Sequence, residues 1–338
     1  MIMKQCIDCG KDIQDAAKIC RFCRAEQPQN NAGLLNSIRS QSKLHCTGGI
    51  GKSMGVFAAA NFAVLLLLLF VVNAIVPEYS TSVFWCVLLF GCSAPFIMLL
   101  FSKAIAKWQF DIREIKTDSP ANEREKFLLD LIVALSERAN LPAVPEIGIY
   151  QSEEINAFAT GCGKSHALIA FSSGLLEQMS EEDIAAVAAH ETAHIANGDM
   201  LTMTLLEGLI NSIVIAVEFA IEQTDWYEKM REKSKFISII VQFVIVNVLM
   251  FAGDLVLLWF SRHREFEADE TAARLVSPQA MIGALQALGE DDNAGSKTDA
   301  GTPSAAMMIS APPAWTDLFS THPALERRIE YIKTKFNC

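Results

Sequence analysis

The sequence predicts a mainly α-helical, polytopic membrane protein that contains a small β-sheet and begins with a cysteine-rich segment. Hydrophobic residues make up 51% of the 338 positions. The mean hydropathy of +0.27 is high for a soluble protein, and several long runs lack any charged residue. The net charge of −11 argues against a nucleic-acid partner, because a phosphate backbone attracts the opposite charge.

Residues 1–27 predict a small zinc ribbon. Two C-x-x-C pairs, Cys6 with Cys9 and Cys20 with Cys23, lie about ten residues apart, and each can present two thiolates to one tetrahedral zinc ion. The alternative is a pair of disulfides in an exported segment. Because no apolar signal peptide precedes these cysteines, we favour a structural zinc ion in a reducing cytoplasmic compartment.

A linker and a transmembrane hairpin are expected next. Residues 28–54 are rich in Gln, Asn, Ser and Gly, which is typical of a flexible linker. Residues 56–76 and 83–101 carry no charge and are long enough to cross a bilayer, so a hairpin is expected over 55–103. Lysines flank this hairpin on both outer sides and its turn has none, which places both outer ends in the cytoplasm.

The rest of the chain, 104–338, is expected to form one domain with a small sheet. An amphipathic helix is predicted over about 121–140, where apolar residues recur at helical spacing. Short apolar segments bounded by Gly, Pro and Ser predict strands at 146–150, 156–161 and 167–171. An extended peptide could pair with an open edge of such a sheet.

A helix that begins after Ser180 carries the motif H-E-T-A-H. Ser180 is a suitable N-cap, and Gly198 is a plausible stop. His190 and His194 are one helical turn apart, so both imidazoles emerge on one face and can bind one metal ion. Glu191 lies one position further round, where its carboxylate could take a proton from a water activated by zinc.

A second charged segment offers a third metal ligand. In R-H-R-E-F-E-A-D, Glu265 could complete a His-His-Glu zinc site, and Asp269, four residues later, could orient one of the imidazoles. Glu267 lies on the opposite side of the helix and is expected to point away. Taken alone this segment is typical of a solvated helix, but together with H-E-T-A-H it favours a zinc site.

A second hydrophobic hairpin, at 205–260, separates the two parts of the candidate site. Its apolar runs, 205–221 and 236–260, enclose a loop with four basic residues. The positive-inside rule places that loop in the cytoplasm, whereas a hairpin leaving a cytoplasmic domain places it outside. The hairpin either crosses the bilayer, which we favour, or lies partly submerged against the catalytic domain. In both cases the site is expected close to the bilayer surface.

The C-terminal part contains one more candidate residue. Residues 289–316, rich in Gly, Asp, Ser and Pro, predict a mobile loop that leads to the motif T-H-P. His322 in this motif could approach the zinc site as a polar gate or as a donor to the transition state. It could equally cap the following helix, since Pro323 suits a first helical turn. Both alternatives stay open.

Four motifs together resemble those of the HtpX-like membrane metalloproteases, which are related to the CAAX prenyl protease. The similarity runs over about 55–335, and the motifs occur in the family's order: N-A-F-A-T-G from Asn156, H-E-T-A-H, E-F-E-A-D from Glu265, and T-H-P. The resemblance implies a cytoplasmic gluzincin-type metalloprotease domain in which Glu265 is the third zinc ligand and Glu191 the catalytic base. It also implies a substrate-binding edge that includes Asn156, Ala157 and Phe158.

By this resemblance the chain is a zinc endopeptidase of the cell inner membrane, with unfolded proteins or membrane proteins as substrates. The family is implicated in quality control of misfolded membrane proteins. We therefore expect this chain to act in quality control and in the stress response. The zinc ribbon departs from the short form of the family and indicates regulation or a protein partner. The alternative is a membrane scaffold with a vestigial zinc site that recruits partners through the ribbon. A complete set of catalytic groups favours the enzyme.

Overall fold

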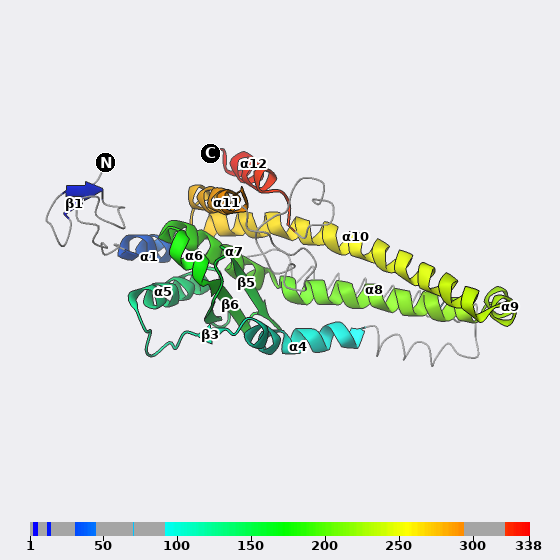
Figure 1. Ribbon diagram of the computed structural model, residues 1–338. Helices are drawn as coiled ribbons and strands as arrows, with labels where there is room; N and C mark the ends of the chain where they lie inside the picture. Colours follow the sequence, from blue (N-terminus) through cyan, green and yellow to red (C-terminus); the bar gives the residue numbers. More distant parts are fainter. Residues whose placement is uncertain (1–2, 6–11, 15–30, 45–69, 71–91, 294–321) are drawn as a thin grey trace.

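A four-stranded sheet in the order β3-β4-β6-β5 lies at the centre of the folded domain. The computed structural model describes residues 3–5, 12–14, 31–44, 70, 92–293 and 322–338 (Figure 1). β4 and β6 run parallel, and the two outer strands are antiparallel to their neighbours. The strands are β3 (Arg113–Glu114), β4 (Glu146–Tyr150), β5 (Ala157–Gly161) and β6 (Ala167–Ser172).

The predicted strands at 146–150, 156–161 and 167–171 are confirmed to within one residue. β3 is missed by the sequence pattern, because two residues are too few to show alternation. All six residues of β6 are buried, since this strand has neighbours on both sides and helices on both faces. β5 is left at one edge of the sheet.

Helices cover the two faces of the sheet unequally. Ile169 and Phe171 of β6 belong to the main core, which also contains the apolar faces of α5 (Glu123–Arg138) and α7 (Glu181–Asn197). The opposite face carries a smaller cluster with residues of the C-terminal part of α4 (Cys92–Gln109). The predicted amphipathic helix at 121–140 is therefore confirmed as α5.

α7, which carries the H-E-T-A-H motif, lies inside this core. It begins as expected at Ser180, whose hydroxyl accepts a hydrogen bond from the Asp183 N–H at 3.2 Å. It ends at Gly198, whose φ of 74° is a left-handed conformation that glycine adopts without steric cost. Nearly every residue between is buried, and the many alanines allow neighbouring elements to approach α7 closely.

The segment expected to be a flexible linker contains an ordered helix, so that prediction is wrong for residues 31–44. α1 (Asn31–Ser40) lies against α5, and its Ile38 side chain, 1% exposed, is part of the main core. The chain then pairs with the end of α5, where the Leu44 N–H donates to the Arg138 carbonyl at 2.8 Å. The polar composition concealed the few apolar residues, spaced three apart, that dock this helix.

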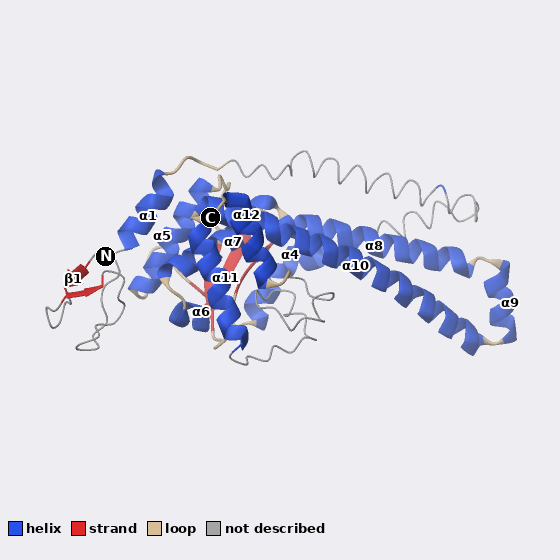
Figure 2. Cartoon of the chain, turned by 90° about the horizontal axis from the view of Figure 1, so that it is seen from above, coloured by secondary structure: helices blue, strands red, loops and turns tan. Residues whose placement is uncertain are grey.

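Two helices are long and apolar enough to cross a membrane, judged by length and composition: α8 (Asp199–Glu222) and α10 (Lys235–Leu275). They form the predicted second hairpin, and α9 (Asp225–Lys233) occupies its connecting loop. The hairpin extends away from the sheet in both views (Figures 1 and 2), and most of the apolar section of α10 is exposed. This arrangement favours a projecting hairpin over one submerged against the domain.

Close packing joins the two arms of this hairpin. A Cβ atom added at Gly253 of α10 would lie 2.4 Å from Ile210 Cγ2 of α8, so only glycine permits this approach. α4 packs along α8 and continues to Gln109, eight residues beyond the predicted end of the second span. α10 does not stop at the apolar section either but continues as one helix through Glu265 and Asp269.

Several expectations lie outside the described residues. The short strands β1 (Met3–Gln5) and β2 (Asp12–Gln14) pair antiparallel within the expected zinc ribbon, but Cys6, Cys9, Cys20 and Cys23 are not described. The same holds for nearly all of the first expected span. The expected loop over 289–316 begins later than predicted, because α11 (Pro278–Asn293) includes its first five residues. The domain boundaries stay predictions.

Ser172 should be a sensitive point of this fold. Its buried hydroxyl accepts hydrogen bonds from the N–H groups of Asn156 and Leu175, each at 3.0 Å, and donates to the Glu154 carbonyl at 2.7 Å. Ser172→Ala leaves these groups without partners and should destabilise the domain by about 1–3 kcal/mol. Thermal unfolding in detergent measures this, with the exposed Ser119→Ala as the matched control. Equal melting temperatures for the two variants would contradict the assignment.

Candidate active site

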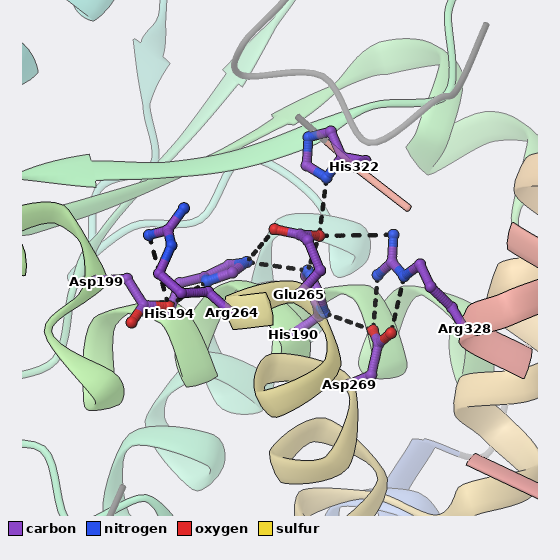
Figure 3. A network of polar contacts seen from close by, with 8 residues as sticks. All are labelled: His190, His194, Asp199, Arg264, Glu265, Asp269, His322 and Arg328. Carbon is purple, nitrogen blue, oxygen red and sulfur yellow. Dashed lines mark hydrogen bonds and ion pairs between the residues drawn. The ribbon is translucent and has the colours of Figure 1, made fainter. Parts of the chain in front are cut away.

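The crossing of α7 and α10 brings together the residues that the sequence predicts as metal ligands. His190 and His194 project from α7 toward α10, and Glu265 projects from α10 between them (Figure 3). One ligand atom from each residue lies within 4.8 Å of the others. The side chains of His190 and Glu265 are 2% exposed and that of His194 is 14% exposed, so the group is largely shielded from water.

The spacing of the ligand atoms fits a tetrahedral zinc ion. The Nε2 atoms of His190 and His194 are 3.1 Å apart. Each lies 3.4 Å from one oxygen of the Glu265 carboxylate. Ligands at about 2.0–2.1 Å from a tetrahedral zinc ion are separated by about 3.3 Å. Two imidazoles and one carboxylate are a common donor set for catalytic zinc, and they leave a fourth position for water or substrate.

Each imidazole is oriented by a carboxylate on its other nitrogen. Asp269 Oδ1 lies 3.0 Å from His190 Nδ1, and Asp199 Oδ2 lies 2.6 Å from His194 Nδ1. Such partners fix the ring so that Nε2 faces the metal position. The sequence predicts the first of these contacts but misses Asp199. Its position could have indicated this role, because Asp199 directly follows Gly198, where α7 ends, and is therefore close to His194 in the chain.

Arg328 of α12 (Leu325–Phe336) holds Asp269 in place. Its Nε and Nη2 atoms donate to the two Asp269 oxygens at 2.8 and 2.6 Å, and its Nη1 atom lies 3.6 Å from Glu265 Oε2. The guanidinium is completely buried, so the charges of this pair are shielded from water. Sequence reasoning missed Arg328, because 59 residues separate it from Asp269 and no local pattern marks it.

Two buried carboxyl groups of the site have opposite pKa shifts. Burial raises the pKa of Glu191, which makes its carboxylate a stronger proton acceptor. Burial also acts on Glu265, but His322 and the two histidines of α7 outweigh it and hold the pKa of Glu265 well below its usual value. Glu265 is therefore suited to bind a cation, and Glu191 to accept a proton.

A cavity of about 120 Å³ lies beside the ligand group. Glu191, 4% exposed, lines it together with the three ligands. Of the expected substrate edge, Ala157 and Phe158 also line the cavity, followed by Ala159. Asn156 does not; its N–H instead donates to Ser172 at the start of the edge strand. The cavity thus connects the metal position with the edge strand β5.

His322 faces the site and does not cap α12. Its Nδ1 atom lies 2.8 Å from Glu265 Oε2, and its side chain lines the cavity (Figure 3). The N-cap position of α12 is Ala324, which makes no side-chain hydrogen bond. Of the two alternatives for His322, the structure therefore favours a role at the site. Glu267 points away as expected, with its side chain 53% exposed.

Two histidines and a glutamate around one position, a buried glutamate beside them and helices able to span a bilayer define a membrane-bound metalloprotease. The comparison with known families agrees: the model of peptidase family M48 matches residues 120–335. The chain belongs to peptidase family M48. For that family the His190, His194 and Glu265 group implies a zinc cofactor.

Named relatives support the same assignment. Protease HtpX of Pasteurella multocida (strain Pm70) is 38% identical over 281 residues, which cover 82% of this chain and 96% of that protein. Protease HtpX homolog of Methylacidiphilum infernorum (isolate V4) is 36% identical over 298 residues, or 83% of this chain and 98% of that protein. The resemblance to the HtpX-like proteases is therefore confirmed.

A solved structure shares the fold. The crystal structure of S. mikatae Ste24p superposes with a TM-score of 0.55 at 19% identity. The match covers 85% of this chain and 65% of that one. At this identity the likeness concerns the fold alone.

Asp199 should set the zinc affinity through His194. Asp199→Asn weakens the partner that fixes the imidazole, so we expect about 10–100-fold weaker zinc binding. The measurement is the free zinc concentration that gives half-maximal cleavage by the full-length enzyme in a metal buffer. Glu267→Gln, an exposed carboxylate two residues from Glu265, is the matched control. An unchanged zinc requirement in Asp199→Asn would show that the contact does not orient His194.

Proposed function

We propose that the chain is a membrane-bound zinc endopeptidase in which His190, His194 and Glu265 hold the metal and Glu191 is the catalytic base. The observation that carries this proposal is the ligand spacing of 3.1–3.4 Å, with Glu191 lining the same cavity. Asp269 and Asp199 orient the two imidazoles, and Arg328 neutralises Asp269. A zinc ion held there would polarise a peptide carbonyl and lower the pKa of a water molecule.

The side chains of the cavity then divide the remaining steps. Glu191 accepts a proton from the attacking water while a C–O bond forms at the scissile carbonyl carbon. The same carboxyl group returns that proton to the amide nitrogen as the C–N bond breaks. His322, whose Nδ1 atom lies 2.8 Å from Glu265 Oε2 and whose side chain lines the cavity, is placed to donate a hydrogen bond to the carbonyl oxygen as it becomes negative.

The edge strand β5 is the proposed binding platform for the substrate. Among the described strands it pairs only with β6, and its residues 157–159 line the cavity. An extended peptide that adds to this edge would present its main chain to the metal position. The alanines at 157 and 159 leave room for side chains of different sizes, which suits the cleavage of unfolded proteins.

The position of the site supports membrane-protein substrates and a role in quality control. Glu265 is five residues beyond the apolar section of α10, or about 8 Å along the same helix. A segment that emerges from the bilayer beside α10 would meet the cavity directly. The flanking lysines of the first expected span support a cytoplasmic active site at the cell inner membrane. The N-terminal ribbon, with its own zinc ion, is proposed to bind a protein partner or to regulate the enzyme.

Substitution of the base should separate catalysis from metal binding. We expect Glu191→Gln to keep its zinc but to lower the rate of casein cleavage by at least about 10²–10⁴-fold, because the proton acceptor is removed. Glu265→Ala should instead bind one zinc ion fewer per chain. Both are measured on detergent-purified, full-length protein, as cleavage on gels and as zinc content by elemental analysis.

The outcomes discriminate between the enzyme and its alternatives. Cleavage by the wild type alone supports the mechanism, whereas equal cleavage by Glu191→Gln would indicate a contaminating protease. No cleavage by a wild type that carries its full zinc content would favour a scaffold with a vestigial site. An unchanged zinc content in Glu265→Ala would overturn the ligand assignment.

A further inference from the structure

A second arginine, largely but not fully buried, lies at the site, lines the cavity and has no role in the mechanism above. Arg264 lies on α10 directly before Glu265, and its side chain is 14% exposed. Its Nη1 atom is 3.8 Å from Asp199 Oδ2, and its Nε atom is buried without a hydrogen-bond partner among the described residues. Met200 and Ser261 line the cavity beside it.

The pairing of Arg264 with Asp199 is too loose to explain its position. A separation of 3.8 Å is beyond hydrogen-bond range, and the same Asp199 oxygen already accepts from His194 at 2.6 Å. Arg328, the other buried arginine of the site, is held by two short hydrogen bonds to Asp269. A buried donor is normally satisfied, so a free one in a substrate cavity indicates that the ligand supplies the acceptor.

The charge around Arg264 selects the kind of acceptor. Asp199 lies close enough to neutralise the guanidinium and to repel an incoming carboxylate, whereas a neutral carbonyl oxygen meets no such repulsion. Arg264 and His322 lie on different sides of the Glu265 carboxylate (Figure 3). The oxygen that Arg264 reaches is therefore not the scissile carbonyl that His322 faces but that of a flanking residue.

We propose that Arg264 donates a hydrogen bond to a flanking main-chain carbonyl oxygen of the peptide substrate. This inference rests on the proposed endopeptidase function and deepens it: Arg264 is a substrate-positioning residue that grips any sequence, because every peptide has the carbonyl. Together with the edge strand β5, it would fix the backbone at a second point along the cavity.

The test measures peptide binding without cleavage. The full-length Glu191→Gln protein, loaded with zinc, is compared with Glu191→Gln/Arg264→Met for binding of a fluorescein-labelled casein peptide by anisotropy. Methionine keeps the apolar stem and removes the donors, so Kd should rise by about 10–100-fold, as expected for a hydrogen bond from a charged donor. Arg264→Lys in the same Glu191→Gln background keeps the positive charge but not the planar guanidinium donors. It should recover only part of the lost affinity. Zinc content should be equal in all three proteins.

A peptide series then identifies the acceptor. In each member one backbone carbonyl is replaced by a methylene group. At one position, this replacement should raise the Kd for Glu191→Gln as much as adding Arg264→Met does. The same modified peptide should bind Glu191→Gln/Arg264→Met no more weakly than the unmodified peptide does. Equal binding of the unmodified peptide by Glu191→Gln with and without Arg264→Met would overturn the proposal at any affinity. A preference for peptides with acidic side chains that disappears in Arg264→Met would also overturn the proposal, because Arg264 would then bind a side chain and not a main-chain carbonyl.

Failure of the proposed function is visible separately. A wild type that binds the peptide through Arg264 but never cleaves it would refute the endopeptidase while leaving the contact intact. A wild type that cleaves casein with the same kcat and KM as Arg264→Met would refute the contact while leaving the endopeptidase intact.

Discussion

The crossing of α7 and α10 is the constraint on which the rest of the structure depends. It must bring two imidazoles and a carboxylate to one point, which requires the two backbones to lie close together. On α10, Ala268 and Ala272 share the face of Glu265 at helical spacing, and α7 is rich in buried alanines. Because the side chains at this contact are small, the two helices lie close enough for the histidines of α7 to reach Glu265 of α10. The caps at Ser180 and Gly198 fix where α7 starts and stops, and therefore which residues face α10.

When the histidines are neutral, the charged groups of the site carry an excess of negative charge that a divalent cation would balance. Two arginines, Arg264 and Arg328, lie among four carboxyl groups: Glu191, Asp199, Glu265 and Asp269. Counted as formal charges, the carboxylates are in excess by two, which is the charge of a zinc ion. Buried charges are costly unless paired. Without the metal, protons on His190 and His194 would supply the missing charge, because hydrogen bonds to carboxylates outweigh burial and raise the pKa of both rings. Metal binding should therefore be coupled to the release of protons.

The sequence was most informative where function imposes fixed local spacing. His190, His194 and the pair Glu265 and Asp269 each follow a four-residue helical period, so one pattern marks both the helix and the site. Three strands and α5 followed from apolar periodicity in the same way. Asp199 and Arg328 could not be found, because their partners are set by how helices pack rather than by local sequence. The docked helix α1 was missed for a related reason: two apolar residues, Leu35 and Ile38, suffice once a core exists to receive them.

One continuous helix, α10, joins the exposed apolar section to the candidate active site. α10 is apolar and exposed over its first part and then supplies Ser261, Arg264 and Glu265 to the cavity within little more than one turn. A break in the helix would let the site move relative to the bilayer, whereas α10 runs as one helix over its 41 residues. The proposed contacts of the peptide, with the β5 edge and with Arg264, are made to its backbone and hence require no particular sequence. If both proposed contacts hold, selection would come from position: a chain would be cleaved because an unfolded segment reaches the cavity beside the apolar helices. Under the proposed function, such an enzyme would distinguish folded from unfolded membrane proteins without reading their sequences.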